Sequence, residues 1–239
     1  MSAVLAAEKL AKTFTLHQRG GLQLPVFAGL DLEVGAGECV VLTGRSGSGK
    51  SSLLRCLYGN YEPTAGTVRI RHADEWLDLG AAAPRTVLDV RRCSLGYVSQ
   101  FLRVIPRVPA LDIVAEPLRR LGVAADAARE QAAQWLARLN LSERLWRLPP
   151  ATFSGGEQQR VNIAHGLIAA HPILLLDEPT ASLDADNRRV VVDLIRAARE
   201  RGAAIVGIFH DDEVRRAVAT REFDVECFRS APHPHPPSL

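Results

Sequence analysis

The sequence predicts an α/β fold, in which helices cover a sheet of buried strands. Three short apolar runs, at 39–43, 173–176 and 203–209, have the length and apolar character of buried strands, and the first is also rich in β-branched residues. Segments with apolar residues at helical spacing follow the first two runs. The chain has 239 residues, of which 47% are hydrophobic and 23% charged, so it is long enough for one large domain or one domain with a subdomain.

The N-terminal segment is predicted to form an antiparallel sheet at the edge of the fold. Residues 4–14 have a strand-like pattern, and residues 27–34 alternate apolar and polar side chains before Gly35 and Gly37. Phe14 has two interpretations. Its ring could stack on an adenine base, or it could belong to the core, as aromatic residues in strands more often do.

The segment from Gly44 to Ser51 fits the pattern G-x-x-x-x-G-K-[ST] of a phosphate-binding loop, the P-loop. It lies between a predicted strand and a predicted helix, and this geometry directs backbone N–H groups and the positive end of the helix dipole at one point. Lys50 is suited to neutralise phosphate oxygens and the Ser51 hydroxyl to bind Mg2+. The alternative is an ordinary glycine-rich turn. The candidate phosphate-binding residues are Gly44, Arg45, Ser46, Gly47, Ser48, Gly49, Lys50 and Ser51.

Two further strand elements are expected before the middle of the chain. Residues 67–70 and 76–79 flank a short hairpin, with Asp74-Glu75 at its turn. Residues 94–99 form another strand, and Gln100 follows it at the sheet edge where α/β proteins bind ligands. A lone glutamine at such a place is usually only a polar loop residue.

The next segment combines a candidate docking loop with a helical region. Residues 101–109 mix apolar groups with two arginines and two prolines, a composition that suits a docking loop as well as a core element. Residues 126–139 predict an amphipathic helix, and Pro149-Pro150 ends a helical region around 145–148. The apolar face of the amphipathic helix is expected to carry Ala127, Gln131, Trp135 and Leu136.

Ser154-Gly155-Gly156-Glu157 has the form of a capping box that opens a helix. A good helix start is the simplest interpretation. Two glycines in a first helical turn nevertheless cost up to about 1 kcal/mol each, which favours close approach of a ligand. Ser154, Gly155 and Gly156 are therefore candidates for a second anion site, separate from the P-loop.

Asp177 and Glu178 follow the buried run 173–176. Two adjacent carboxylates at the end of such a strand are costly unless they meet a cation or take part in chemistry, and a solvated strand end is the alternative. Side chains alternate in direction along a strand. One carboxylate can therefore face a Mg2+ ion held by Ser51, while the other orients or deprotonates a water molecule.

A helix is predicted after Ser182-Leu183-Asp184, and Gly202 ends it. His210 follows the next predicted strand, again at the sheet edge. Taken alone, such a histidine is usually structural, but beside the other candidates it is expected to contact a γ-phosphate.

Composition limits the remaining possibilities. The net charge of +2 and the absence of a lysine-rich run do not indicate nucleic acid as a partner. The four cysteines have no C-x-x-C spacing, and no signal peptide or membrane helix is apparent, so the chain is expected to be cytoplasmic with reduced cysteines. The Pro/His-rich tail, 230–239, is expected to be disordered.

These motifs occur in one order, and together they resemble the ATP-binding cassette (ABC) ATPase family over nearly the whole chain. The resemblance implies a P-loop NTPase fold with a RecA-like core, an antiparallel β subdomain and an α-helical subdomain at about 101–160, all within a single domain at 1–229. The motifs that carry it are Gly44 to Ser51, Gln100, Phe153 to Glu157, Asp177-Glu178, Ser182 to Asp184, and His210.

The resemblance also implies ATP and Mg2+ as cofactors and a head-to-tail homodimer. In such a dimer the Ser154-Gly155-Gly156 segment of one copy closes on ATP held by the P-loop of the other. Glu178 would polarise the attacking water, His210 would sense the γ-phosphate, and Phe14 would stack on adenine. Lys50, Ser51, Asp177 and Gln100 would hold phosphate and Mg2+, and Ser52 and Asp184 would complete the nucleotide-binding set.

Three residues depart from the pattern of the family. Glu157 stands where glutamine is usual, Ser52 replaces the usual threonine, and His165 occupies a position where arginine is common. None of these changes removes a catalytic group. The changes at Glu157 and His165 affect the expected interface chemistry and pH sensitivity.

At finer grain, residues 74–79, 101–115 and 202–211 look like the L subunit of the bacterial carbon-phosphorus lyase system. This similarity implies soluble lyase subunits as partners in phosphonate catabolism, at the synthesis of α-D-ribose 1-methylphosphonate 5-triphosphate. The alternative is the ATP-binding subunit of a phosphonate-type or lipoprotein-type ABC transporter, in which 101–109 would grip a membrane permease and the chain would lie peripherally on the inner membrane. A DNA-repair or translation-type protein is disfavoured because no coiled-coil insertion or second cassette is present.

Overall fold

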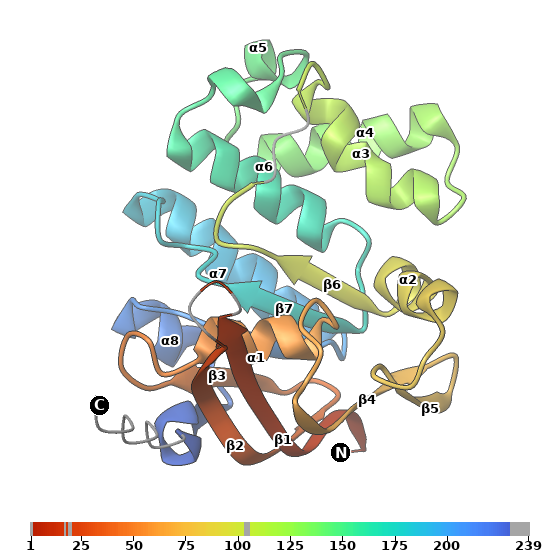
Figure 1. Cartoon of the computed structure of the whole chain (residues 1–239). Coiled ribbons are helices and arrows are strands. Elements are labelled where there is room, and N and C mark those ends of the chain that lie inside the picture. The colour runs from red at the N-terminus through yellow and green to blue at the C-terminus, as the bar shows by residue number, and fades with distance from the viewer. Residues whose placement is uncertain (1, 17, 19–20, 103–105, 230–239) are drawn as a thin grey trace.

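The computed structural model describes residues 2–16, 18, 21–102 and 106–229, in two sheets with flanking helices (Figure 1). The larger sheet has the order β6-β7-β8-β3-β9, and all of its neighbouring strands are parallel. β7 and β8 are buried along their whole length, as the apolar runs predict, and the α/β class is confirmed. The strands of this sheet are β3 (Cys39–Thr43), β6 (Leu95–Val98), β7 (Ile173–Asp177), β8 (Ala204–Ile208) and β9 (Arg221–Asp224).

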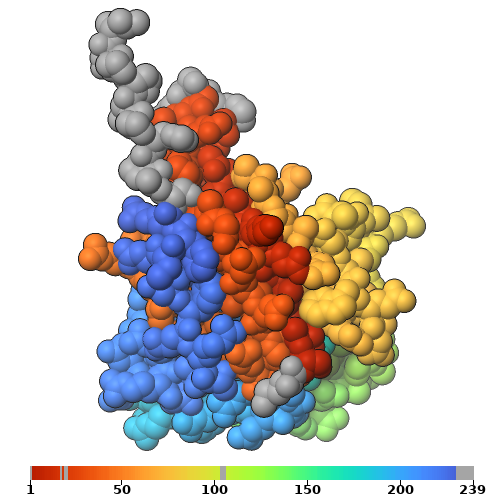
Figure 2. All heavy atoms as spheres, turned by 90° about the horizontal axis from the view of Figure 1, so that it is seen from below, coloured from red at the N-terminus to blue at the C-terminus, as the bar shows by residue number. Residues whose placement is uncertain are grey.

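The smaller sheet has the antiparallel order β2-β1-β4-β5, which confirms the predicted N-terminal sheet. The predicted turn of the β4-β5 hairpin was one residue too late. Ala73 and Asp74 form it, with φ angles of 49° and 67°, while Glu75 already pairs with His72. Seen from below, β1 and β2 lie between the C-terminal elements and the segment that includes α2 (Figure 2). The strands are β1 (Ala3–Leu16), β2 (Leu22–Gly35), β4 (Ala65–His72) and β5 (Glu75–Asp78).

The helices form two groups. Figure 1 shows α3, α4 and α5 gathered in a layer beyond the larger sheet, with α6 running from that layer toward β7. The layer contains α3 (Ala110–Arg120), α4 (Ala125–Arg138), α5 (Glu143–Trp146), the 3-10 turn η2 (Pro150–Thr152) and α6 (Gly155–Leu167). The others are α1 (Lys50–Leu57), α2 (Pro84–Cys93), α7 (Ala185–Glu200), α8 (Asp212–Val218) and the 3-10 turn η3 (Val225–Phe228).

Three of these helices, α2, α3 and α8, were not predicted, and the buried side of a fourth was predicted only in part. Val90 is the only fully buried residue of α2, so little of this helix lies in the core. In α4 the predicted apolar face was right at Leu136 and in part at Trp135, but wrong at the other two positions. Ala127 and Gln131 are exposed, whereas Ala128, Ala132 and Leu136 are buried. Alanines occur on both sides of this helix, so packing against its neighbours, and not composition, selects the buried side.

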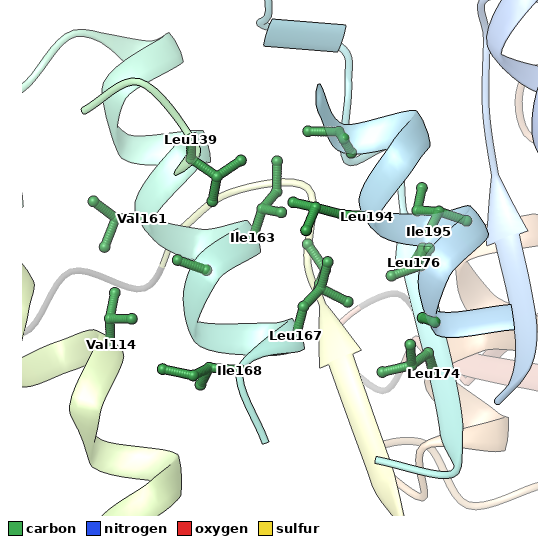
Figure 3. Close-up of a cluster of buried hydrophobic side chains, with 14 of the residues drawn as sticks. Val114, Leu139, Val161, Ile163, Leu167, Ile168, Leu174, Leu176, Leu194 and Ile195 are labelled. Carbon is green, nitrogen blue, oxygen red and sulfur yellow. The ribbon is translucent and has the colours of Figure 1, made fainter. Parts of the chain in front are cut away.

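Helix α6 joins the helical layer to the larger sheet. In Figure 3, Val161 lies near Val114 of α3, whereas Leu167 points toward the side chains of β7 and α7. All of these residues belong to one continuous hydrophobic cluster. A second cluster, which includes Phe27 and Leu53, fills the space between the two sheets. The start of α6 is therefore connected to β7 by a packed core.

The end of α7 agrees with the sequence analysis. Gly202 has a φ of 95° and ends α7 as predicted. No helix in the described part of the chain is long and apolar enough to cross a membrane. The predicted Pro/His tail lies outside the described residues, as do 103–105 of the predicted docking loop.

Candidate functional site

Glycine conformations shape the loop between β3 and α1. Gly44, Gly47 and Gly49 have φ angles of 123°, 78° and 98°, a region that side chains with a Cβ rarely enter. A Cβ at Gly44 would lie 2.8 Å from the Ser48 hydroxyl, and one at Gly49 would lie 2.5 Å from Val26 Cγ1. The loop therefore wraps tightly before α1, whose first N–H groups have no partner within the helix.

Polar contacts fix the same loop. Lys50 Nζ donates hydrogen bonds to the carbonyl oxygens of Gly44 at 2.7 Å and Arg45 at 2.9 Å. The Ser48 hydroxyl is buried and has no partner among the described residues. The backbone N–H of Arg45 donates to Glu226 Oε2 at 3.3 Å, a contact that sequence analysis did not anticipate, because Glu226 lies in no motif. The cradle and its lysine fit a phosphate group.

Asp177 is the metal-binding candidate, and both of its carboxylate oxygens have a donor. Ser51 Oγ donates to Oδ1 at 3.1 Å, and the hydroxyl of Tyr97 donates to Oδ2 at 3.1 Å. Asp177 is 2% exposed, and burial raises the pKa of its carboxyl. A carboxylate and a hydroxyl next to a phosphate cradle match the oxygen ligands of Mg2+, which usually binds one or two carboxylates together with phosphates.

Glu178 is held from two sides. Gln100 Nε2 donates to Glu178 Oε2 at 3.1 Å, and His210 Nε2 lies 2.6 Å from Glu178 Oε1. Glu178 adopts a φ of 52°, a backbone conformation that a non-glycine residue keeps only where its surroundings require it. A carboxylate at such a position has the chemistry to orient or deprotonate a water molecule.

The strand order explains why these three residues meet. Gln100 follows β6, Glu178 follows β7 and His210 follows β8, and these strands are adjacent in the sheet. The carboxyl ends of parallel strands share one edge, where α/β proteins bind their ligands. The structure therefore brings together the three predicted catalytic residues, next to Asp177.

Two buried amides of α6 support this edge and were missed by sequence analysis. Gln159 Nε2 donates to the carbonyl oxygen of Pro179 at 3.0 Å, and Asn162 Nδ2 donates to that of Ser99 at 2.6 Å. Pro179 follows Glu178, and Ser99 precedes Gln100. The available signal was the presence of two polar residues on an otherwise apolar helix face.

The second predicted anion site does not meet the P-loop within the chain. The capping box is confirmed: Ser154 Oγ accepts a hydrogen bond from the backbone N–H of Glu157 at 3.4 Å, and Glu157 Oε2 accepts one from the backbone N–H of Ser154 at 2.8 Å. The Ser154 hydroxyl also donates to Glu157 Oε2 at 2.7 Å, and this bond lowers the pKa of Glu157. Figure 1 places the start of α6 apart from α1. A Cβ at Gly156 would lie 3.0 Å from the carbonyl oxygen of Ser182, so contact within the chain is enough to explain this glycine, whereas a Cβ at Gly155 would meet nothing within 4 Å.

The remaining candidates have local partners. Asp184 caps α7 by accepting a hydrogen bond from the backbone N–H of Asn187 at 2.8 Å. Phe14 packs edge to face on Tyr61, with ring centroids 5.2 Å apart, and Lys12 Nζ lies 4.8 Å from the Phe14 centroid. Ser52 lies in the first turn of α1.

Comparison with known proteins decides the family. The model of the ABC transporter family matches residues 27–181. The chain belongs to the ABC transporter family. Its sequence is 42% identical to the lipoprotein-releasing system ATP-binding protein LolD of Maricaulis maris, over 88% of this chain and 89% of that protein. The ABC cassettes of this family bind ATP together with Mg2+.

Other similar proteins extend this comparison. The chain is 37% identical, over 83% of its length, to an uncharacterized ABC transporter ATP-binding protein of Mycobacterium tuberculosis, but it spans only 58% of that protein. The solved dimer of the bacterial ABC transporter cassette MJ0796 superimposes with a TM-score of 0.83, at 29% identity, covering 93% of this chain and 95% of that one. Another structure shows the MJ0796 dimer in a post-hydrolysis state bound to ADP and Pi, with a TM-score of 0.82. The P-loop ABC fold is therefore confirmed.

Proposed function

We propose that this chain is the ATP-hydrolysing subunit of an ABC transporter. The observation that carries the proposal is the position of the Glu178 carboxylate, bonded to Gln100 and His210 at the edge of the sheet and adjacent in sequence to Asp177. ATP bound with Mg2+ would supply the phosphoryl group whose transfer to water releases energy.

Each residue at this edge receives a role from its chemistry. Lys50 neutralises phosphate oxygens, while Ser51 and Asp177, with Gln100 nearby, hold the cation. Glu178 accepts a proton from water or orients it, and His210 contacts the γ-phosphate. The neighbouring strand ends hold Gln100, Glu178 and His210 together before any ligand arrives.

The proposed working unit is a head-to-tail homodimer. Ser154, Gly155 and Gly156 lie apart from the P-loop of their own chain, so they can act on nucleotide only when a second copy supplies it. The family relative MJ0796 has been solved as a dimer with ADP and Pi, which supports this arrangement. In this proposal residues 1–229 form one domain, with a helical subdomain at about 101–160.

A cavity of about 630 Å³ beside the site is the proposed docking place for a membrane permease. It is lined by Arg55 of α1, Arg91 of α2 and Ile113 of α3, together with Phe101 and Leu102. Phe101 is 71% exposed, which is unusual for so large an apolar side chain. Basic and apolar groups on this lining suit a partner segment that carries acidic and apolar side chains. The chain would then sit peripherally on the cytoplasmic side of the membrane.

The relatives favour transport over phosphonate catabolism. Their names are those of a lipoprotein-releasing system and of ABC transporter ATP-binding proteins. None of these names supports the finer resemblance to the carbon-phosphorus lyase L subunit or a role in making a phosphonate ribosyl triphosphate. That role remains the rival outcome of the partner experiment below.

Hydrolysis is tested with purified protein, ATP and Mg2+. Glu178→Gln should lower turnover at least about 100-fold, the usual contribution of a positioned base, and should leave ATP binding intact and the dimer trapped. Lys50→Ala should weaken ATP binding itself. The matched controls are Glu213→Gln and Lys9→Ala, two exposed residues outside the site. Normal turnover in Glu178→Gln, or unchanged ATP affinity in Lys50→Ala, would contradict the assigned roles.

The partner is tested by cross-linking and affinity purification of the tagged protein from soluble and membrane fractions. The transporter proposal predicts recovery of an integral membrane protein, and recovery of soluble carbon-phosphorus lyase subunits would overturn it. Phe101→Ala should reduce recovery of the membrane partner. Leu88→Ala should not, because Leu88 is a similarly exposed apolar residue, 63% accessible, that does not line the cavity.

A further inference from the structure

Tyr97 connects Asp177, the metal-binding candidate, with the wall of the proposed docking cavity. Its hydroxyl donates to Asp177 Oδ2 at 3.1 Å, while Ser51 Oγ donates to the other oxygen of the same carboxylate at the same distance. Tyr97 and Asp177 both line the proposed docking cavity. The carboxylate therefore has one donor from the P-loop helix and one from the cavity wall.

Packing on the cavity side holds the ring of Tyr97. The ring stacks on that of Tyr58, with centroids 4.9 Å apart and planes inclined by 29°. The guanidinium of Arg91 lies 4.6 Å from the Tyr58 ring centroid and donates to the carbonyl oxygens of Tyr58 at 3.2 Å and Gly59 at 3.0 Å. These contacts set the position from which the Tyr97 hydroxyl reaches Asp177.

A buried carboxylate with two fixed donors has a restricted orientation. Hydrogen bonds to charged groups are among the stronger ones in proteins, and groups that bond to metal ligands orient those ligands. If Ser51 turns its hydroxyl toward a cation, Tyr97 remains the donor that holds Asp177 in place. Phenylalanine at this position would keep the stacking but would lose that donor.

We propose that Tyr97 is a positioning residue that orients Asp177 for divalent cation binding and joins the docking cavity to the metal site through one hydrogen bond. The inference rests on the proposed function, in which Asp177 holds the cation of bound nucleotide. It assigns to Tyr97 a role in metal affinity that the motifs do not include.

The test compares Tyr97→Phe with Tyr61→Phe. Arg55, which lines the same cavity, donates to the hydroxyl of Tyr61 at 2.7 Å, but Tyr61 makes no hydrogen bond to Asp177. The measurement is the binding of Mn2+ in the presence of ADP, followed by electron paramagnetic resonance, together with calorimetry of ADP binding without metal. Tyr97→Phe should weaken Mn2+ binding about tenfold, as loss of a bond to a metal ligand typically does, and should leave metal-free ADP binding unchanged. Tyr61→Phe should match the wild type in both.

The outcomes distinguish failure of the positioning role of Tyr97 from failure of the proposed ATPase function. Wild-type Mn2+ affinity in Tyr97→Phe, or an equal loss in Tyr61→Phe, would overturn the positioning role and leave the ATPase proposal standing. Failure of the wild-type protein to bind Mn2+ with ADP would overturn both. Thermal unfolding without nucleotide shows that each variant is folded before its metal affinity is compared.

Discussion

Gly49→Ala offers a direct test of how the P-loop is built. Gly49 has a φ of 98° and is the N-cap residue of α1, and a Cβ on it would lie 2.5 Å from Val26 Cγ1 and 3.2 Å from Phe27 Cδ1. Forcing alanine into this conformation costs about 1–2 kcal/mol. Phe27 is fully buried in the core between the sheets, so the added methyl also overpacks it, at about 1–3 kcal/mol. The total is a loss of about 2–5 kcal/mol in the free energy of unfolding.

Gly47→Ala is the matched control. Gly47 has a φ of 78°, but a Cβ there would meet no atom within 4 Å. The free energy of unfolding of Gly47→Ala should therefore fall only by the cost of placing alanine in this backbone conformation, about 1–2 kcal/mol. The difference between the variants isolates the contact of the added methyl with Val26 and Phe27.

The assay is urea unfolding of the nucleotide-free protein, followed by far-UV circular dichroism, with the double variant Gly49→Ala/Val26→Ala completing a cycle. Because Val26→Ala removes the nearest atom, it should cost less in the Gly49→Ala background than in the wild type. Thermal midpoints should fall by about 2–4 °C for each kcal/mol lost. Equal urea midpoints for Gly49→Ala and Gly47→Ala would refute the reasoning, as would a cycle without coupling.

Two further predictions concern buried polar groups. Asn162→Ala should lower the free energy of unfolding by about 1–3 kcal/mol, because it leaves the Ser99 carbonyl without its donor. The same variant should also slow ATP turnover. Urea unfolding measures the first effect and an ATPase assay the second. Burial lowers the pKa of His171 below its usual 6.5, and its Nε2 lies 3.2 Å from the carbonyl oxygen of Arg92. Protonation thus favours the unfolded chain, so stability should be complete above pH 6.5 and fall as the pH drops toward the lowered pKa. In His171→Gln, the urea midpoint should change less with pH below 6.5 than in the wild type. An unchanged pH dependence of the midpoint would mean that other groups cause it.

Much of the site could be predicted from the sequence because its signals are local. The spacing of Gly44, Gly49 and Lys50 specifies a strand, a tight loop and a helix start within a few residues. The carboxylates of Asp177 and Glu178 follow an apolar run directly, which places them at a strand end whatever the rest of the chain does. The capping box at Ser154 is likewise complete within four residues.

Other features could not be predicted because they depend on residues far apart in the chain. Tyr97 and Asp177 are 80 positions apart, and only the pairing of β6 with β7 brings them into contact. Part of the buried side of α4 was missed because alanine on either face satisfies the same pattern, and packing selects Ala128 over Ala127. A Cβ on Gly156 would lie 3.0 Å from the carbonyl oxygen of Ser182, a contact between distant parts of the chain that no local pattern shows.

The sequence by itself determined which groups stand at the ends of strands and where glycine permits a phosphate cradle, since backbone conformation and strand direction are local properties. The tertiary structure decided which strand ends are neighbours. The order β6-β7-β8-β3 sets Gln100, Glu178 and His210 side by side next to the P-loop, and no local pattern encodes that order. It arises from hydrogen bonding and burial across the whole sheet, where each strand gains its stability from partners distant in sequence.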